Sequence, residues 1–204
     1  MKAWHFLQDN GELRWPCGDI TKPEVGQKLT VDPDRLELCK YGLHGSEKPL
    51  DALRYATGHW LCRDEFGGRI IRGDDKLVAS ERTILIMADA TNMLRHFARL
   101  CALDVIDKWN APDVVKKFLR TGDKSLREAA YSAACSAICQ PACSAAICQP
   151  ACSAAHSAAR SVARSAARSA ARAAARAAAR ERQNRRLTRL ANELFRSQLA
   201  NTGE

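Results

Sequence analysis

The sequence lacks any long apolar run, and this absence limits where the chain is expected to reside. No stretch approaches the ~18–20 consecutive apolar residues that a membrane-spanning helix needs. Residues 1–15 also lack the apolar core of a secretory signal. We therefore expect a cytoplasmic protein with no membrane partner.

Large apolar side chains are missing from the second part of the chain. Residues 129–180 contain no leucine, phenylalanine, tryptophan or methionine, and nearly half of them are alanine. The overall hydrophobic content of 46% therefore overstates the material available for a core. Core-forming side chains are concentrated in residues 1–128, which predicts a globular region followed by a tail.

Acidic residues are also scarce in that tail. Residues 129–204 carry eleven arginines and three glutamates, whereas positive and negative charges nearly balance in residues 1–128. The net charge of +9 thus belongs to the tail, and so does any attraction to a polyanion.

The pattern of the first 88 residues predicts a small α+β domain with antiparallel strands. Gly11 favours a turn after the first strand, and residues 13–15 are expected to return beside that strand. Ser46 is a plausible N-cap of a helix that ends at Gly58. The expected strands are residues 2–7, 29–31, 59–66 and 80–88, with a turn at Gly67-Gly68 and a new strand after it.

The rest of the chain divides into three helical stretches. Apolar residues recur at helical spacing in residues 89–130, and a four-residue Ala/Ser repeat fills residues 131–182, with a continuous helix expected over 153–182. Residues 183–204 form an amphipathic helix whose apolar face must pack on something. That face consists of Leu187, Leu190, Leu194, Phe195 and Leu199. Because the large side chains lie earlier, we expect a folded domain to remain after deletion of residues 131–204.

Short motifs of the first domain occur in a recognisable order. A Trp4-His5 strand precedes the box Tyr41-Gly42-Leu43-His44-Gly45-Ser46, a helix near Tyr55, a Trp-Leu-Cys strand and Glu81 at the start of a β-run. This order resembles the poly-ADP-ribose polymerase-like branch of the ADP-ribosyltransferase superfamily, although Phe6 and His44 depart from its motifs.

The resemblance implies a split antiparallel sheet that binds NAD. By position, His5 matches the histidine that hydrogen-bonds the NAD ribose, and His44 matches the residue that stacks on nicotinamide, with Tyr55 nearby. Glu81 matches the catalytic glutamate that stabilises the developing positive charge. The alternative is that Glu81 is a surface residue and that both histidines are hydrogen-bonded locally.

A second resemblance spans the whole chain. The Gly-Leu-His box, the following Asp-Ala-Leu segment and the Ser-Ala-Ala repeats look like those of uncharacterised proteins of bacteriophages and prophages. This resemblance implies a phage-type origin, and hence a bacterial host cell, but says little about activity.

A run of cysteines in the tail is a weak candidate for a metal site. Residues four apart on a helix lie one turn apart, so two thiolates could share a soft metal ion. The spacing is, however, simply that of the repeat, and drift of the repeat explains it as well. The odd total of nine cysteines argues against a closed disulfide framework. The candidate ligands are Cys135, Cys139, Cys143, Cys148, Cys152 and His156.

The arginine stripe is the candidate nucleic-acid site. Arginines four apart advance by about 40° around a helix and about 6 Å along it, so they form a spiral that could follow a phosphate backbone. The stripe has no aromatic side chain for stacking, so binding would be unspecific and salt-sensitive. The alternatives are association with a protein partner or a second copy, and a solvated spacer. The arginines are Arg160, Arg164, Arg168, Arg172, Arg176, Arg180, Arg185, Arg186 and Arg189.

Three functions remain open from the sequence. The leading one is a phage-type accessory protein that acts by binding, with a head for a nucleotide-like ligand or a protein and a tail for nucleic acid or a partner. The second is an NAD-dependent ADP-ribosyltransferase. The third is an assembly protein that uses the repeat helix to oligomerise.

Overall fold

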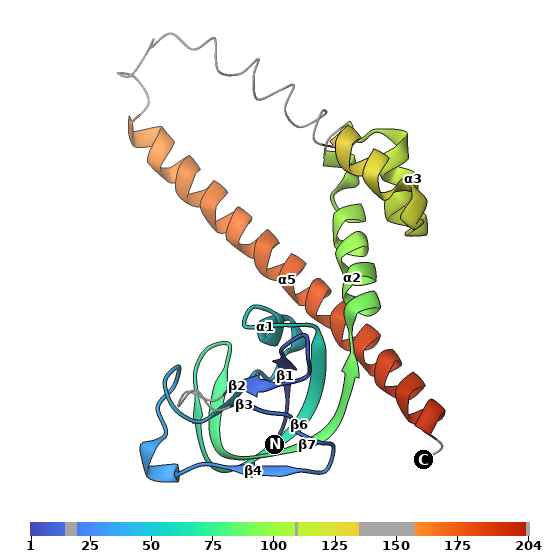
Figure 1. Ribbon diagram of the computed structural model, residues 1–204. Coiled ribbons are helices and arrows are strands. Elements are labelled where there is room, and N and C mark those ends of the chain that lie inside the picture. The colour runs from blue at the N-terminus through green and yellow to red at the C-terminus, as the bar shows by residue number, and fades with distance from the viewer. Residues whose placement is uncertain (15–19, 109, 135–157, 203–204) are drawn as a thin grey trace. The chain divides into compact units, whose positions relative to one another are not determined.

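A computed structural model describes residues 1–14, 20–108, 110–134 and 158–202. The chain forms two compact units, one made of Met1–Arg95 with Gln183–Glu204 and the other of His96–Arg182. The first unit holds an antiparallel sheet, and the second is helical (Figure 1). The predicted α+β class is confirmed.

The first unit is built around a five-stranded antiparallel sheet. Its path runs β1-β6-β7-β4, and β5 pairs with β7 beside β4. The short strands β2 and β3 form a separate ribbon, so residues 13–14 do not return along the first strand as expected. The strand bounds are β1 Lys2–Leu7, β2 Leu13–Arg14, β3 Ile20–Thr21, β4 Lys28–Thr30, β5 Leu43–Gly45, β6 Trp60–Arg72 and β7 Leu77–Asp89.

The glycine pair at positions 67 and 68 does not make the expected turn. Instead β6 runs on as one 13-residue strand, and β7 pairs with it along its length (Figure 1). The pairing register shifts between Gly67 and Ile70, where Gly68 has a φ of 65°. The two glycines therefore form a bulge, which bends the hairpin without ending the strand.

The segment that contains Ser46 closes the sheet. Ser46 and Trp4 exchange two backbone hydrogen bonds of 2.8 and 2.9 Å, which join the end of β5 to β1. Ser46 is therefore not a helix N-cap, and α1 is confined to Pro49–Leu53. Because β5 also pairs with β7, the strands β1, β6, β7 and β5 enclose a small core.

The two faces of this sheet bury different clusters. Ala3, Phe66, Leu77 and Ala79 pack together on one side. The other cluster joins strand, α1 and C-terminal side chains, and the ring of Trp4 stacks on that of Phe195 with centroids 6.0 Å apart. The members of the second cluster are Trp4, Phe6, Ala52, Leu61, Ala88, Ala90, Ala191 and Phe195.

The C-terminal residues thus complete the core of the first unit. They belong to α5 (Ala158–Thr202), which continues without a break from the repeat into the amphipathic segment. Leu187 is fully buried, and the amide of Leu50 donates to the Asn184 side chain at 3.3 Å. The expectation that the globular region is separate from the C-terminal residues is therefore corrected, whereas folding after deletion of residues 131–204 stays a prediction.

The helices that the sequence predicted after residue 89 lie largely in the second unit, and the earliest of them begins in the first. These are α2 (Thr91–Leu103), α3 (Asp113–Thr121) and a helical stretch over residues 127–134, with 3-10 turns η2 (Ile106–Lys108) and η3 (Lys124–Leu126). A further 3-10 turn, η1, covers Pro33–Arg35 in the first unit. No helix in the described part of the chain is long and apolar enough to cross a membrane.

Candidate functional site

A pocket of about 270 Å³ lies in the first unit, lined by residues of β1, β5 and α1. A second hollow of about 420 Å³ adjoins it, because five residues line both. These shared residues are His5, Phe6, Cys39, His44 and Tyr55. The structure therefore brings together the three side chains that the ADP-ribosyltransferase resemblance assigns to NAD binding.

His5 forms the inner wall of this pocket. It lies on β1 between the buried residues Trp4 and Phe6, opposite Cys62 of β6. Burial lowers the pKa of His5 well below its usual value, and the charge of Arg82 and the neighbouring His44 lower it further. Its imidazole is therefore neutral, and among the described residues its buried Nδ1 has no hydrogen-bond partner.

His44 also lines the pocket, and the hydrogen bonds of its ring lie within its own loop. Its Nε2 accepts the amide of Cys39 at 3.0 Å, so the ring proton is on Nδ1. Burial lowers the pKa of His44, and a hydrogen bond to the Gly42 backbone opposes this effect only in part. The sequence left local hydrogen bonding as the alternative role of this histidine. These local bonds fix the His44 ring, so it shapes the pocket rather than transferring protons.

Tyr55 and Lys76 form the rim. The Tyr55 hydroxyl donates to the Asp75 carboxylate at 2.9 Å, and Arg54 pairs with the same carboxylate at 2.6 Å. The ammonium of Lys76 lies 4.3 Å from the centroid of the Tyr55 ring. Although Tyr55 is 45% exposed, these contacts hold its ring at the edge of the pocket.

Glu81 is not brought to this pocket. Its carboxylate pairs with Lys28 of β4 at 3.0 Å, and both side chains are substantially exposed. Glu81 also does not line either hollow. The structure thus unites two of the three predicted catalytic residues and leaves the third in a surface ion pair.

A buried charged pair lies beneath the two histidines, and the sequence reasoning missed it. Asp64 and Arg82 are almost completely buried, with Oδ2 and Nε 3.6 Å apart. Arg82 also donates to the carbonyl of His44 at 3.3 Å. Burial raises the pKa of Asp64 to about 6, against the opposing charges of Arg82 and Arg63. The sequence did contain a sign of this buried pair: the acidic Asp64 occupies the same alternating face of the strand as the buried Cys62 and Phe66.

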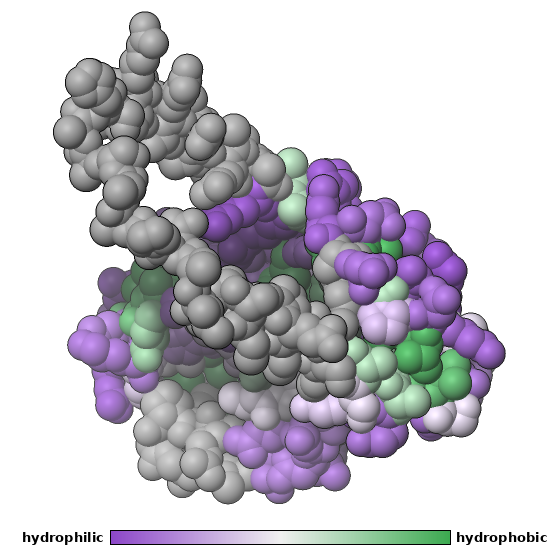
Figure 2. Space-filling view, turned by 90° about the horizontal axis from the view of Figure 1, so that it is seen from above, coloured by the Kyte–Doolittle hydropathy of each residue, from purple (hydrophilic) through white to green (hydrophobic). Residues whose placement is uncertain are grey.

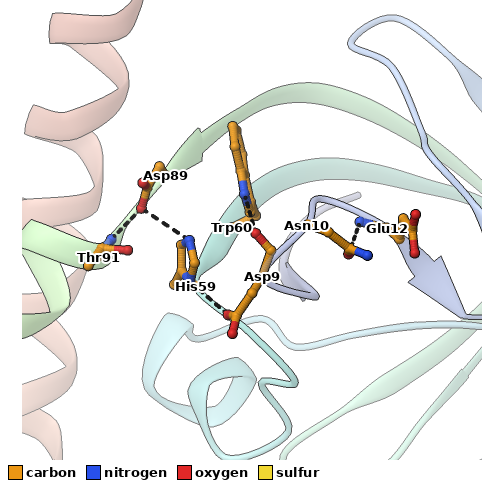
Figure 3. A network of polar contacts seen from close by, with 7 residues as sticks. All are labelled: Asp9, Asn10, Glu12, His59, Trp60, Asp89 and Thr91. Atoms are coloured by element: carbon orange, nitrogen blue, oxygen red, sulfur yellow. Dashed lines mark hydrogen bonds and ion pairs between the residues drawn. The ribbon is translucent and has the colours of Figure 1, made fainter.

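A third histidine, His59, contacts Asp9 in the turn after β1, which borders the second hollow (Figure 3). Its Nδ1 lies 2.7 Å from the Asp9 carboxylate, and its Nε2 lies 3.6 Å from that of Asp89. The Trp60 indole donates to the Asp9 carbonyl at 3.2 Å. These contacts make His59 a positioning residue that ties the turn after β1 to the ends of β6 and β7.

The tail candidates fall largely outside the described residues. This holds for the cysteines from 135 to 152 and His156, and the side chains of the arginines from 160 to 172 are likewise not described. Among the described residues, no three His, Cys, Asp or Glu side chains are grouped to hold a metal ion. Of the remaining arginines, Arg186 is half-buried, whereas Arg176, Arg180, Arg185 and Arg189 are exposed. Hydrophilic residues also dominate the described surface that faces the viewer in Figure 2.

Comparison with known protein families finds a match for the first part of the chain. Residues 1–96 match a family described as a domain of unknown function (DUF7666). This range contains every residue that lines the pocket. No curated protein matches the chain. No solved structure matches it either.

Proposed function

We propose that the first unit is a binding module for a small, planar, nucleotide-like ligand. The observation that carries the proposal is the meeting of His5, His44 and Tyr55 around one pocket. Three ring-bearing side chains that line one pocket suit a flat heterocycle, because aromatic groups stack favourably on one another. The phage-type accessory role follows from the whole-chain resemblance and agrees with a protein that acts by binding.

The unpartnered nitrogen of His5 supplies a polar anchor for such a ligand. A buried polar atom without a hydrogen bond carries a cost of about 1–3 kcal/mol, which a bound donor or acceptor would remove. Small-molecule sites commonly combine apolar walls with a few polar groups of this kind. Here Trp4, Phe6 and Ala52 give the apolar wall, and His5 gives the polar group.

Binding is favoured over ADP-ribosyl transfer because of where the carboxylates lie. Transfer would need an acidic group beside the ribose to stabilise positive charge, and Glu81 is held by Lys28 instead. Glu12 lines the adjoining hollow and is the carboxylate to examine if NAD is consumed. A transferase would release nicotinamide from NAD, whereas a binding module would return NAD unchanged.

The test is titration of the full chain with NAD, ADP-ribose and AMP, followed by calorimetry and amide chemical shifts. We expect saturable binding of at least one of them, with shifts at residues 39–45 and 52–55. His5→Phe keeps a flat ring but removes both nitrogens. It should weaken binding by tenfold or more, because the ligand group that bonds to His5 would then be left unpaired in the site.

The matched control is His96→Phe, which makes the same change at an exposed histidine of the second unit. It should bind as the parent does. Absence of saturable binding for all three ligands, or equal binding by His5→Phe, would overturn the proposal.

The tail supports a second role in contacting nucleic acid. The arginines at 176, 180, 185 and 189 are exposed in the described part of α5, and Arg189 pairs with Glu193 one turn away at 3.9 Å. An exposed cationic helix attracts phosphate without reading sequence. Association with a protein partner or with a second copy is the competing outcome, and a salt titration separates the two.

A further inference from the structure

Cys39 occupies an unusual position at the mouth of the pocket. It lines both hollows and is exposed, and it takes part in no disulfide. Among the described residues other than glycine, only Cys39 has a positive φ, at 73°. The hydrogen bond from its amide to Nε2 of His44 holds this conformation.

One cationic side chain, Lys76, lines the same pocket as Cys39. Lys76 hydrogen-bonds to the Cys39 side chain, and this contact is the main reason that the pKa of Lys76 is raised. The Tyr55 ring fixes the same ammonium from another side at 4.3 Å. Lys40, the next residue along the chain, lines the second hollow and is neutralised by Glu37 at 2.6 Å, so Lys76 is the cation that acts on Cys39. An exposed thiol beside a lysine is the setting in which cysteines become reactive nucleophiles.

A separate observation shows that this pocket is suited to a bound group. The Nδ1 atom of the half-buried His5 is shielded from solvent in the pocket wall and has no hydrogen-bond partner among the described residues. Lys76 is the charged residue that lines this pocket. Glu12 lines the adjoining hollow, and the Asp75 carboxylate accepts from Tyr55 at the rim. On the side of the pocket that Lys76 occupies, an anion is favoured over a cation.

We propose that Cys39 is a modification site that undergoes thiol–disulfide exchange with small anionic disulfides. The Cys39 sulfur attacks one sulfur of the disulfide, so that one S–S bond forms while the original S–S bond breaks. The electron pair of the broken bond leaves on the second sulfur, which takes up the proton lost by Cys39. Cys39 is oxidised to a mixed disulfide, and the small disulfide is reduced to one free thiol.

The other described cysteines provide an internal comparison. Cys62 is completely buried, and burial raises its pKa far above the usual range. Cys101 is half-buried in the second unit. Neither lines the pocket, so both should react more slowly than Cys39.

The test measures labelling at each cysteine of the full chain with two small disulfides of opposite charge. Dithiobis(nitrobenzoate) is anionic and cystamine is cationic. Trypsin places the three cysteines in separate peptides, residues 36–40, 55–63 and 100–108, which mass spectrometry quantifies under non-reducing conditions. With the anionic disulfide, we expect the peptide 36–40 to be labelled about tenfold faster than the peptide 100–108.

Lys76→Gln removes the positive charge beside Cys39. It should slow labelling of Cys39 by the anionic disulfide about fivefold, which is the change in rate expected when one close charge pair is lost in water. Labelling by cystamine should change less than twofold. Lys76→Arg should restore the anionic rate, and Lys2→Gln, an equal charge change outside the pocket, should leave both rates unaltered.

Equal labelling of the peptides 36–40 and 100–108, or an unchanged anionic rate in Lys76→Gln, would overturn the inference. The mixed disulfide would also fill the pocket and compete with the ligand, a consequence that rests on the proposed function. The two proposals fail separately, because labelling does not require nucleotide binding and His5→Phe does not alter the thiol.

Discussion

At the residue scale, the pocket depends on buried groups whose protonation is set by their surroundings. His5 and His44 are held neutral by burial, so neither is suited to act as a cation toward a ligand. Asp64 and Arg82 share a fully buried environment in which neither Asp64 carboxylate oxygen has a hydrogen bond among the described residues. Such a pair stabilises the fold little, because desolvation offsets the attraction.

The raised pKa of Asp64 predicts a specific dependence of stability on pH. In the folded chain this pKa is about 6, whereas its usual value is 3.8, so the folded state holds a proton that the unfolded state has lost between these values. The free energy of unfolding should therefore fall as the pH rises from about 4 to about 6, by up to about 3 kcal/mol from this group. Urea denaturation at several pH values measures it.

Asp64→Asn provides the control, because asparagine resembles the protonated carboxyl group. His5 and His44 make the opposite contribution, since their lowered pKa values cost stability as the pH falls below about 6.5. They are present in both proteins, so the difference between parent and variant isolates Asp64. A pH-independent difference would show that Asp64 is already ionised at pH 4.

At the element scale, the C-terminal part of α5 is a structural member of the sheet unit. Trp4 connects it to the pocket, because Trp4 stacks on Phe195 and also lines the pocket. Arg63 lies 4.3 Å from the centroid of the Trp4 ring. Residues separated by nearly the whole chain thus fix the strand that carries His5.

Removal of the Phe195 ring should therefore destabilise the sheet unit. Phe195→Ala leaves a cavity beside Trp4 and should lower the free energy of unfolding by about 3–5 kcal/mol, as for other buried phenylalanines. Leu199→Ala changes a 45% exposed side chain of the same helix and should cost less than about 1 kcal/mol. Denaturant unfolding followed by tryptophan fluorescence distinguishes them, and similar losses in both would contradict the packing.

At the scale of the whole molecule, a nearly neutral sheet unit is joined to a strongly basic helix. The positive charge of residues 129–204 is carried entirely by arginine, which contacts phosphate through a planar group with several donors. If the tail binds nucleic acid, the interaction is electrostatic and depends on counterion release.

The salt dependence of binding tests this role. With about four to six phosphate contacts, affinity for a duplex or a single strand should fall by roughly two to three orders of magnitude between about 50 and 200 mM salt. Glutamine keeps the helix propensity, so replacing Arg160, Arg164, Arg168, Arg172, Arg176 and Arg180 by Gln should abolish most binding at low salt. The same positions changed to lysine should retain it. Equal binding by the Gln variant would leave association with a partner as the better explanation.

The sequence by itself determined the features that depend on local pattern. Alternating and branched residues identified the strands at 2–7 and 80–88, and helical spacing identified the helices after residue 89. The Gly-Leu-His box and its resemblance pointed to His5, His44 and Tyr55, which do line one pocket. Composition alone assigned the basic charge to the tail.

Tertiary structure decided everything that depends on contacts between distant residues. The two glycines after Phe66 were compatible with a turn, and pairing with β7 made them a bulge instead. The apolar face around Leu187 needed a partner, and only the folded sheet shows that Trp4 and its neighbours provide it. Glu81 lies in a surface ion pair with Lys28 because the β4–β7 register sets its neighbours. Propensity acts over a few residues, whereas strand pairing and burial join residues far apart in the chain, and the site was built by the latter.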